Sequence, residues 1–439
     1  NRLDFMGSNY TIDAACASSL IATEIGVQDL LTGKYDLSVI GGAHICNDIP
    51  FLTLFSSLGA VSPRSKIQPF DEAADGTIPG EGIGVILLKR LADAERDGER
   101  IYAVIKGVGS ASDGRGLSVT APRVEGEELA LRRAYEMAGI DPKTVELIEA
   151  HGTGTAVGDA AEVEVLHRVF GTREEGTPPW CALGAGKSMI GHCFPASGVA
   201  GMIKAVLALY HKILPPTLNV ENPLAQLRSK DTPFYINTET RPWIHGRQDV
   251  PRRAGVNAFG FGGINAHVIL EEYQKLDELN SPRIHTQWDS EVFIFSGASR
   301  QALIEHAQQV RAFLANSPDV PLKDLAYTLN VAMDKAPYRL SIVATSAEEL
   351  GRKLHLAIER LMDTQRRQIK DMQGIYFFEE PLQGKLAFMF PGEGAQYLNM
   401  LADLCLHFPE VRRCFDQIDQ AFVEQQRGYL PSSIIFPLP

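Results

Sequence analysis

The sequence predicts an α/β fold whose helices cover a mostly buried sheet, followed by a smaller α+β region. Between residues 12 and 272, short apolar runs typical of buried strands alternate with stretches whose apolar residues recur at helical spacing. The 439 residues are also 45% hydrophobic, which is enough apolar material for one large core or two to three smaller ones. Together these observations indicate a layered α/β architecture.

The first element is a helix after Cys16, because apolar side chains recur at three- and four-residue spacing over residues 20–31 and Gly33 then ends the run. The other elements of the first region follow in chain order. Strands are predicted at residues 36–40, 84–88, 145–150, 180–183 and 267–270, and helices at residues 124–139 and 198–212.

The character of the chain changes after Tyr273. Residues 274–288 mix charges with Pro282 and carry few periodic apolar residues, as a linker does. Residues 385–396 predict a buried strand that breaks into a glycine-rich loop. Between them, strands are predicted at 292–295 and 340–344 and amphipathic helices at 300–315 and 347–362. We therefore expect domains at residues 1–272, 273–384 and 385–439.

Composition and charge exclude several classes of protein. The six cysteines form no CxxC pair, so neither a disulfide framework nor a zinc site is expected. The net charge of −12 disfavours binding to nucleic acid, which needs a basic surface. The chain has no uncharged apolar run of about eighteen residues and no signal-peptide pattern, so we expect a cytoplasmic protein without a membrane partner.

Cys16 lies among small residues at the expected start of the first helix, in the stretch DAACASSL. Free N–H groups and the positive end of the helix dipole favour a thiolate there, and the neighbouring alanines leave space for an acyl group. The position therefore suits a nucleophile with a lowered pKa. The alternative is a small buried cysteine that fills a helix–strand junction, since free cysteine is among the most buried residue types.

Two histidines lie on loops that follow predicted strands. His151 belongs to EAHGTGT, and Asp159 with Glu162 is predicted to form a capping box that opens the next helix. His192 ends the loop GAGKSMIGH, which does not fit the phosphate-loop pattern and therefore predicts no nucleotide site. Ligands of open α/β sheets collect at this edge, although His151 could simply bond to backbone in a turn.

Two further patterns have competing interpretations. The loop FGFGGINAH at residues 259–267 offers backbone N–H groups for an oxyanion hole. A tight turn between antiparallel strands, with His267 inside a strand, would look similar. His44 and Cys46 form an H-x-C pair that lacks a second pair of metal ligands, so we interpret both as core residues.

Taken together, these stretches resemble the β-ketoacyl synthase domain of type I polyketide and fatty acid synthases. The resemblance covers residues 1–272 and rests on four motifs in a fixed order. They are DAACASSL around Cys16, EAHGTGTAVGD around His151, KSMIGH ending at His192, and GVNAFGFGGINAHVILEE at residues 255–272. The resemblance implies a thiolase-like fold, two related α/β halves whose paired sheets enclose buried helices, and a homodimer.

The resemblance extends beyond residue 272. Residues 290–380 resemble the α+β linker domain that follows such synthases, and FMFPGEGAQYLNM resembles the start of an acyltransferase. The family carries a longer stretch before its nucleophile, and the acyltransferase motif G-H-S-x-G does not occur here. We therefore expect a fragment with an incomplete first half of the fold and no acyltransferase activity.

The resemblance implies a decarboxylative Claisen condensation. Cys16 would carry the acyl chain as a thioester, and His151 and His192 would hold the enolate left when a malonyl-type thioester loses carbon dioxide. Lys187 would support this polar network. Phe261 would gate the entrance and, with Cys16, offer a backbone N–H group to the second oxyanion.

The same resemblance implies the partners. Thr153 and Thr155 match positions that hydrogen-bond the phosphopantetheine arm, which an acyl carrier protein supplies, so no directly bound cofactor and no metal are expected. Departures at Ala14, Ala17 and Ile264 leave open an iterative polyunsaturated-fatty-acid or enediyne-type module. An inactive scaffold also stays open, whereas a biosynthetic thiolase is disfavoured because the loop at residues 259–267 has no second cysteine.

Overall fold

The computed structural model describes residues 4–116, 121–174, 176–247, 250–274, 288–317, 319–332, 336–380, 384–425 and 429–438. By its contacts the chain falls into two compact units, one of residues Asn1–Pro282 with Gln396–Pro439 and one of Arg283–Ala395. The predicted linker at 274–288 lies almost entirely outside the described residues. The domain boundaries at 272 and 384 stay predictions.

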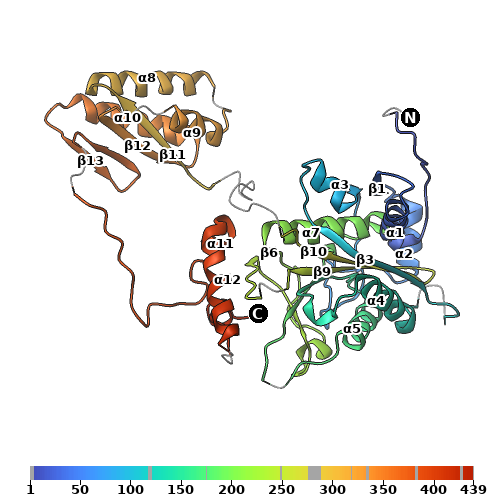
Figure 1. Cartoon of the computed structure of the whole chain (residues 1–439). Coiled ribbons are helices and arrows are strands. Elements are labelled where there is room, and N and C mark those ends of the chain that lie inside the picture. The colour runs from blue at the N-terminus through green and yellow to red at the C-terminus, as the bar shows by residue number, and fades with distance from the viewer. Residues whose placement is uncertain are drawn as a thin grey trace. The chain divides into compact units, whose positions relative to one another are not determined.

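A mixed six-stranded sheet forms the centre of the first unit (Figure 1). In spatial order it contains β3 (Val104–Ser112), β10 (Ile264–Glu271), β9 (Arg253–Gly260), β4 (Leu147–Glu149), β5 (Cys181–Gly184) and β7 (Phe234–Ile236). β10 pairs antiparallel with β3 and β9, and the neighbours β9, β4, β5 and β7 run parallel to one another. The predicted strands at 145–150, 180–183 and 267–270 are confirmed.

Helices cover both faces of this sheet. α4 (Val124–Ala138) and α5 (Ala156–Phe170) lie on one face, and α1 (Ser18–Leu31) and α7 (Ser197–His211) lie on the other (Figure 1). The predicted helices at 20–31, 124–139 and 198–212 are therefore confirmed. α1 ends as expected, with Gly33 at a φ of 71°, a left-handed conformation that glycine adopts without strain.

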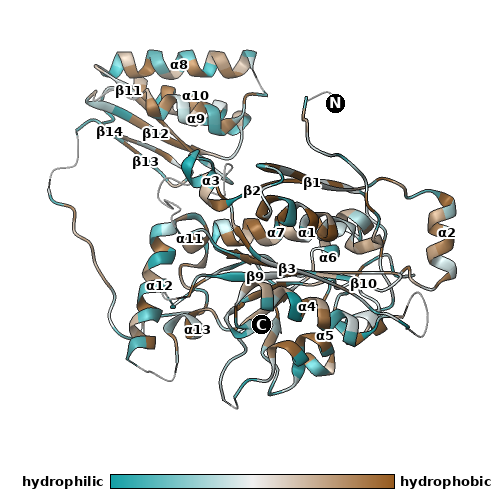
Figure 2. Ribbon diagram, turned by 45° about the vertical axis from the view of Figure 1, so that its right-hand side comes forward, coloured by the Kyte–Doolittle hydropathy of each residue, from teal (hydrophilic) through white to brown (hydrophobic). Residues whose placement is uncertain are grey.

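A second layer of strands lies beyond α1 and α7 (Figure 2). It consists of β1 (Leu37–His44) paired antiparallel with β2 (Gly82–Lys89). The strands at 36–40 and 84–88 are confirmed, but the expectation that they are buried is wrong, because Val39, Val85 and Leu87 are 49%, 53% and 66% exposed. One face rests on the helices, and among the described residues nothing covers the other, so burial alternates with the pleat.

The second unit is the predicted small α+β fold. Its antiparallel sheet has the order β11 (Glu291–Gly297), β12 (Tyr338–Ala344), β14 (Ile375–Phe378) and β13 (Gln368–Asp371). Its helices are α8 (Arg300–Asn316), α9 (Leu322–Val331) and α10 (Ala347–Met362). Ser299 and Ser346 cap α8 and α10 by accepting backbone N–H bonds, and Phe293, Phe295 and Phe377 are fully buried in the core.

The predicted strand at 385–396 is wrong. The described residues of this segment form no strand, and Met389 and Phe390 are 93% and 89% exposed. A buried strand needs neighbouring strands to satisfy its backbone groups, and none of the described strands pairs with this segment.

Short elements complete the described chain. They are α2 (Ile49–Ser57), α3 (Leu91–Arg96), α6 (Lys187–Ile190), β6 (Ile213–Leu214), β8 (Arg241–Pro242), α11 (Ala402–His407), α12 (Pro409–Glu424) and α13 (Pro431–Ile435). Residues 396–439 join the first unit partly through Asp416, whose carboxylate accepts two bonds of 2.9 Å from the buried Arg252 guanidinium. None of the described helices combines the length and apolarity needed to cross a bilayer.

Two glycines explain why β3 was not predicted as a strand. Gly107 and Gly109 interrupt its apolar pattern, yet α4 crosses directly over them. A Cβ atom on Gly109 would lie 2.4 Å from both the Ala130 carbonyl oxygen and the Ala134 backbone nitrogen. Only glycine therefore permits this close approach of helix and strand.

Gly109→Ala should lower the free energy of unfolding of the first unit by about 3 kcal/mol, because the added methyl group meets backbone atoms that cannot move aside. Denaturant unfolding followed by circular dichroism measures the change. Gly351→Ala in α10 is the control, since a Cβ there meets no atom within 4 Å; because α10 belongs to the second unit, this change should leave the free energy of unfolding of the first unit as in wild type. Equal stability of the two variants would contradict the close approach.

Candidate active site

Cys16 lies in a one-turn 3-10 helix (Ala15–Ala17) directly before α1. Local bonds hold this turn. The Asp13 carboxylate accepts the Ala15 backbone N–H at 2.8 Å, and the Ser18 hydroxyl accepts the Ala14 N–H at 2.9 Å. Ala15 has a φ of 49°, an uncommon conformation for a residue with a side chain. The cysteine is thus at a helix start, as predicted, and its side chain is buried.

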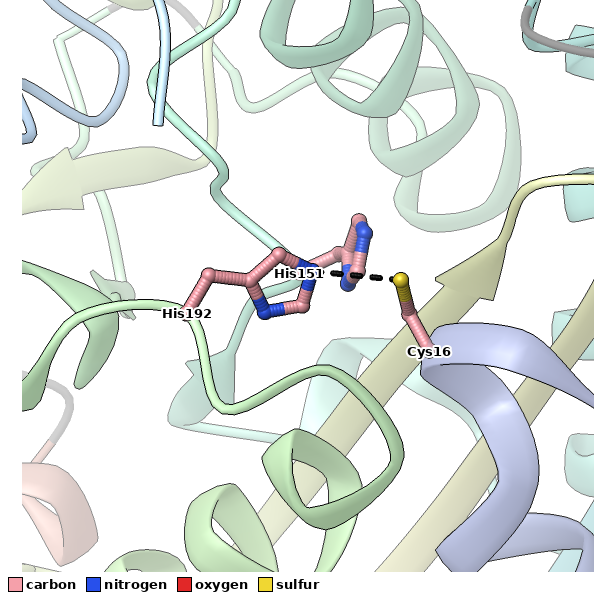
Figure 3. Close-up of side chains that lie close together, drawn as sticks. All are labelled: Cys16, His151 and His192. Carbon is pink, nitrogen blue, oxygen red and sulfur yellow. Dashed lines mark hydrogen bonds between the residues drawn. The ribbon is translucent and has the colours of Figure 1, made fainter. Parts of the chain in front are cut away.

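His192 contacts the cysteine from a loop between α6 and α7. Its Nε2 lies 3.1 Å from Cys16 Sγ (Figure 3). The Phe194 backbone N–H donates to Nδ1 at 3.3 Å, so the neutral ring carries its proton on Nε2, the atom that faces the sulfur. His192 is therefore oriented as a hydrogen-bond donor towards the space beside Cys16.

His151 follows β4, and its ring lies beside that of His192 near the cysteine, with the two ring centroids 5.5 Å apart (Figure 3). Lys187 Nζ donates to the His151 carbonyl oxygen at 2.5 Å and lies 3.5 Å from His151 Nδ1. One donor atom from each of Cys16, His151 and His192 lies within 4.8 Å of the others. The two histidines, which follow the cysteine by 135 and 176 positions in the sequence, thus meet at its sulfur. Lys187 lies behind them, as expected.

Burial dominates the electrostatics of this centre. It lowers the pKa of His151 and of His192 well below the usual value, and the charge of Lys187 lowers both further, so both rings are neutral at pH 7. Burial also raises the pKa of the Cys16 thiol to about 11, although Lys187 and the backbone N–H groups of Phe261 and Cys16 oppose the rise. The expectation that the helix start lowers this pKa is therefore wrong, because desolvation exceeds it.

The backbone N–H groups of Cys16 and Phe261 nevertheless both stabilise negative charge at the sulfur. Phe261 lies in the turn between β9 and β10, so the alternative of a tight turn between antiparallel strands is confirmed, with His267 inside β10. His267 Nδ1 lies 2.6 Å from Asn257 Oδ1. The turn supplies the Phe261 N–H, which converges with the N–H of Cys16 to give the pair of donors that an oxyanion hole needs.

A cavity of about 360 Å³ opens above the three side chains. Thr153 and Thr155 line it, with their hydroxyl oxygens 3.0 Å apart. The Phe261 ring, 40% exposed, stacks on Phe55 at 5.9 Å between centroids, and both rings belong to the cavity wall. All seven residues singled out in the sequence therefore lie at or directly behind one cavity.

Glu162 holds the loop that carries His151. Its carboxylate accepts the backbone N–H groups of His151 and Gly152 at 2.7 and 2.8 Å and the Asn257 side-chain amide at 2.8 Å. The sequence assigned Glu162 to a capping box with Asp159, which is wrong. α5 begins after Thr155, and Asp159 instead accepts the backbone N–H groups of Phe70 and Gly154. Two acids one helical turn apart were the available signal, but their partners lie in distant loops.

The remaining polar patterns are structural. His44 packs against Phe51 and Phe194 and lies 3.1 Å from the Asn47 side-chain oxygen, as a core histidine does. Cys46 is exposed, so its interpretation as a core residue is wrong. Among the described residues, the trio of Cys16, His151 and His192 is the one Cys/His/acid group that could hold a metal ion. The proton on His192 Nε2 faces into this trio. The expectation that no metal is bound stays a prediction.

The fold and the centre together define a class of protein. Helices α1 and α7 lie between two layers of strands, and a cysteine with two neutral histidines occupies one end of them. This is a thiolase-like protein with a Cys–His–His centre.

Within that class, the chain belongs to the β-ketoacyl synthase family. Residues 1–94 match the family model "Beta-ketoacyl synthase, N-terminal domain", residues 102–221 match "Beta-ketoacyl synthase, C-terminal domain", and residues 223–343 match "Ketoacyl-synthetase C-terminal extension". The resemblance inferred from the four motifs is confirmed.

Similar proteins agree with this assignment. A polyunsaturated fatty acid synthase chain from Thraustochytrium sp. is 36% identical over 439 residues, which cover 96% of this chain and 16% of that protein. Polyketide synthase PksN of Bacillus subtilis is 40% identical over 80% of this chain and 7% of that protein. The ketosynthase from module 6 of the bacillaene synthase from Bacillus subtilis 168 superposes with a TM-score of 0.60 at 36% identity, over 81% of this chain and 61% of that one.

Proposed function

We propose that this chain supplies the condensing centre of a type I polyketide synthase in the cytoplasm. The reaction would be a decarboxylative Claisen condensation between an acyl group on Cys16 and a malonyl-type thioester on an acyl carrier protein. The observation that carries the proposal is the 3.1 Å approach of His192 Nε2 to Cys16 Sγ, with His151 beside it and two backbone N–H groups at the sulfur.

Acyl transfer comes first. The Cys16 sulfur attacks the carbonyl carbon of an acyl thioester, the bond from that carbon to the carrier sulfur breaks, and the thiol proton ends on the departing carrier thiol. The backbone N–H groups of Cys16 and Phe261 stabilise the oxyanion of the tetrahedral intermediate, each contributing about 3 kcal/mol by analogy with other oxyanion holes. A thiol with a pKa of about 11 is a strong nucleophile once its proton leaves.

Decarboxylation comes second. The malonyl carboxylate leaves as carbon dioxide, and its bonding electrons form an enolate whose oxygen needs two donors. His192 offers Nε2–H because Phe194 occupies its Nδ1, and Lys187 beside His151 Nδ1 favours the same tautomer there. Neutral donors in a buried site need no reorganisation when the charge appears.

Carbon–carbon bond formation completes the cycle. The enolate carbon attacks the carbonyl carbon of acyl-Cys16, the same two backbone N–H groups hold the oxyanion, and the carbon–sulfur bond breaks. The product is a β-ketoacyl thioester on the carrier, and one proton from solvent restores the Cys16 thiol. No metal and no directly bound cofactor take part in this scheme.

Substrate delivery involves the cavity wall. Thr153 and Thr155 would hydrogen-bond the phosphopantetheine arm of the carrier protein, and Phe261 on Phe55 would gate the entrance. We expect the parent protein to act as a homodimer. A polyunsaturated-fatty-acid-type synthase is the second candidate, favoured because that relative matches 96% of this chain.

Reconstitution tests the proposal. The parent protein, given an acyl thioester and malonyl carrier protein, should form the β-ketoacyl carrier with release of one carbon dioxide per product. Mass spectrometry of the carrier and trapping of labelled carbon dioxide measure the two yields. Acyl exchange without any carbon–carbon bond would instead indicate an inactive condensing centre.

A further inference from the structure

One buried acid in the cavity wall has no role in the chemistry above. Glu127 lies in the first turn of α4, is 2% exposed and lines the same cavity as Cys16 and His151. Its Oε2 atom has no hydrogen-bond partner among the residues that the structure describes. Because a buried polar atom without a partner is costly, an occupant of the cavity that bonds to it would be favoured.

The surroundings keep this carboxyl group protonated. Burial raises the pKa of Glu127 well above its usual value, and the neighbouring carboxyl groups of Glu162 and Asp113 raise it further. The described residues of the cavity wall include no lysine or arginine that would favour the charged form. A neutral carboxylic acid presents one O–H donor, and the two acidic neighbours disfavour an anion beside it.

Close contacts fix Glu127 in place. A Cβ on the preceding residue, Gly126, would lie 2.1 Å from Asp113 Oδ1, so α4 begins directly against the end of β3. The Asn265 side-chain amide donates to the same Asp113 oxygen at 2.7 Å, which ties β10 to this corner. The donor therefore sits on a rigid part of the wall, as a group that selects substrates must.

We propose that Glu127 is a specificity-determining residue whose O–H donates a hydrogen bond to an uncharged oxygen of the bound thioester. That oxygen belongs either to the acyl chain, as a hydroxyl or keto group, or to an amide of the phosphopantetheine arm. The proposal rests on the proposed function, since it requires a thioester in this cavity. A substrate without the oxygen leaves the buried acid unpaired and is therefore disfavoured.

Loading of Cys16 in the parent protein tests this with four thioesters. Butanoyl and 3-hydroxybutanoyl groups are each presented on pantetheine and on propanethiol, which has no amide. Intact-protein mass spectrometry gives kcat/KM for each. Glu127→Leu should lower one of two kcat/KM ratios about tenfold. A lower hydroxybutanoyl-to-butanoyl ratio would identify the acyl chain as the source of the oxygen, and a lower pantetheine-to-propanethiol ratio would identify the arm.

Glu127→Gln is the matched variant, because its amide keeps an uncharged donor of similar size, and both ratios should stay within about threefold of wild type. Unchanged ratios in Glu127→Leu would overturn the proposal, as would an equal loss in Glu127→Gln, which would show that the charge is needed. Glu127→Met replaces the leucine variant if that protein unfolds. Failure of wild-type protein to load any of the four thioesters would count against the proposed function instead.

Discussion

Cys16→Ala should abolish formation of the covalent acyl-protein in the parent enzyme, a loss of at least about a thousandfold in loading, because no other thiol lines the cavity among the residues that the structure describes. Cys193, the nearest cysteine to His192 in sequence, is not among the residues that line the cavity, and its sulfur lies 3.9 Å from the Gly191 carbonyl oxygen. Radiolabelled acyl thioester, followed by precipitation and counting, measures the covalent label.

The matched control is Cys46→Ala, which removes an exposed thiol outside the cavity and should load as wild type does. The alanine variant of Cys16 should keep its fold, since the bonds from Asp13 and Ser18 that hold this turn are retained in the variant. Labelling of Cys16→Ala at the wild-type level would reject the assignment of the nucleophile.

His192→Ala should separate the two half-reactions. Decarboxylation of malonyl carrier protein should fall about a thousandfold, because the variant removes one of the two N–H groups that hold the enolate. Acyl loading should fall much less, since its oxyanion bonds to the backbone N–H groups of Cys16 and Phe261 rather than to the imidazole. Release of labelled carbon dioxide and covalent acyl label are measured on the same samples.

His211→Ala is the control for this experiment. His211 ends α7 outside the cavity, and burial lowers the pKa of its ring as it does for His192, so the variant matches the loss of a neutral imidazole. It should leave both half-reactions within about threefold of wild type. A His192→Ala protein that loses loading and decarboxylation equally would mean that His192 serves the cysteine rather than the enolate.

The catalytic motifs were predictable because each is local. The segment around Cys16 carries small residues and then helical periodicity, and α1 begins where that pattern starts. Gly33 follows α1 at a φ of 71°, the left-handed conformation expected of the glycine that was predicted to end this helix. The glycines of residues 259–267 left a tight turn between strands open beside an oxyanion hole, and the turn occurs there. Such signals depend only on residues that are neighbours in sequence, so they can be recognised without knowledge of the fold.

The charges of the centre were not predictable in this way. A helix start favours a thiolate, but Phe261 in the turn after β9 and His192 in the loop between α6 and α7 help to enclose Cys16, and the resulting desolvation raises its pKa to about 11. Glu162 was assigned to a helix cap because its bonds to His151 and Asn257 cross 11 and 95 positions of chain. Glu127, whose Oε2 has no partner among the described residues, gives no sequence signal at all, since an acid in the first turn of a helix is ordinary.

The sequence by itself determined the family, the elements near each motif and the identity of the residues that meet at the cavity. The tertiary structure alone decided which faces of the strands are covered, which acids are buried and which form of each titratable group is stable. The physical reason is the separation along the chain between the residues that take part in each interaction. Backbone conformation follows from a few adjacent residues, whereas desolvation and hydrogen-bond partnership depend on segments that only folding brings into contact.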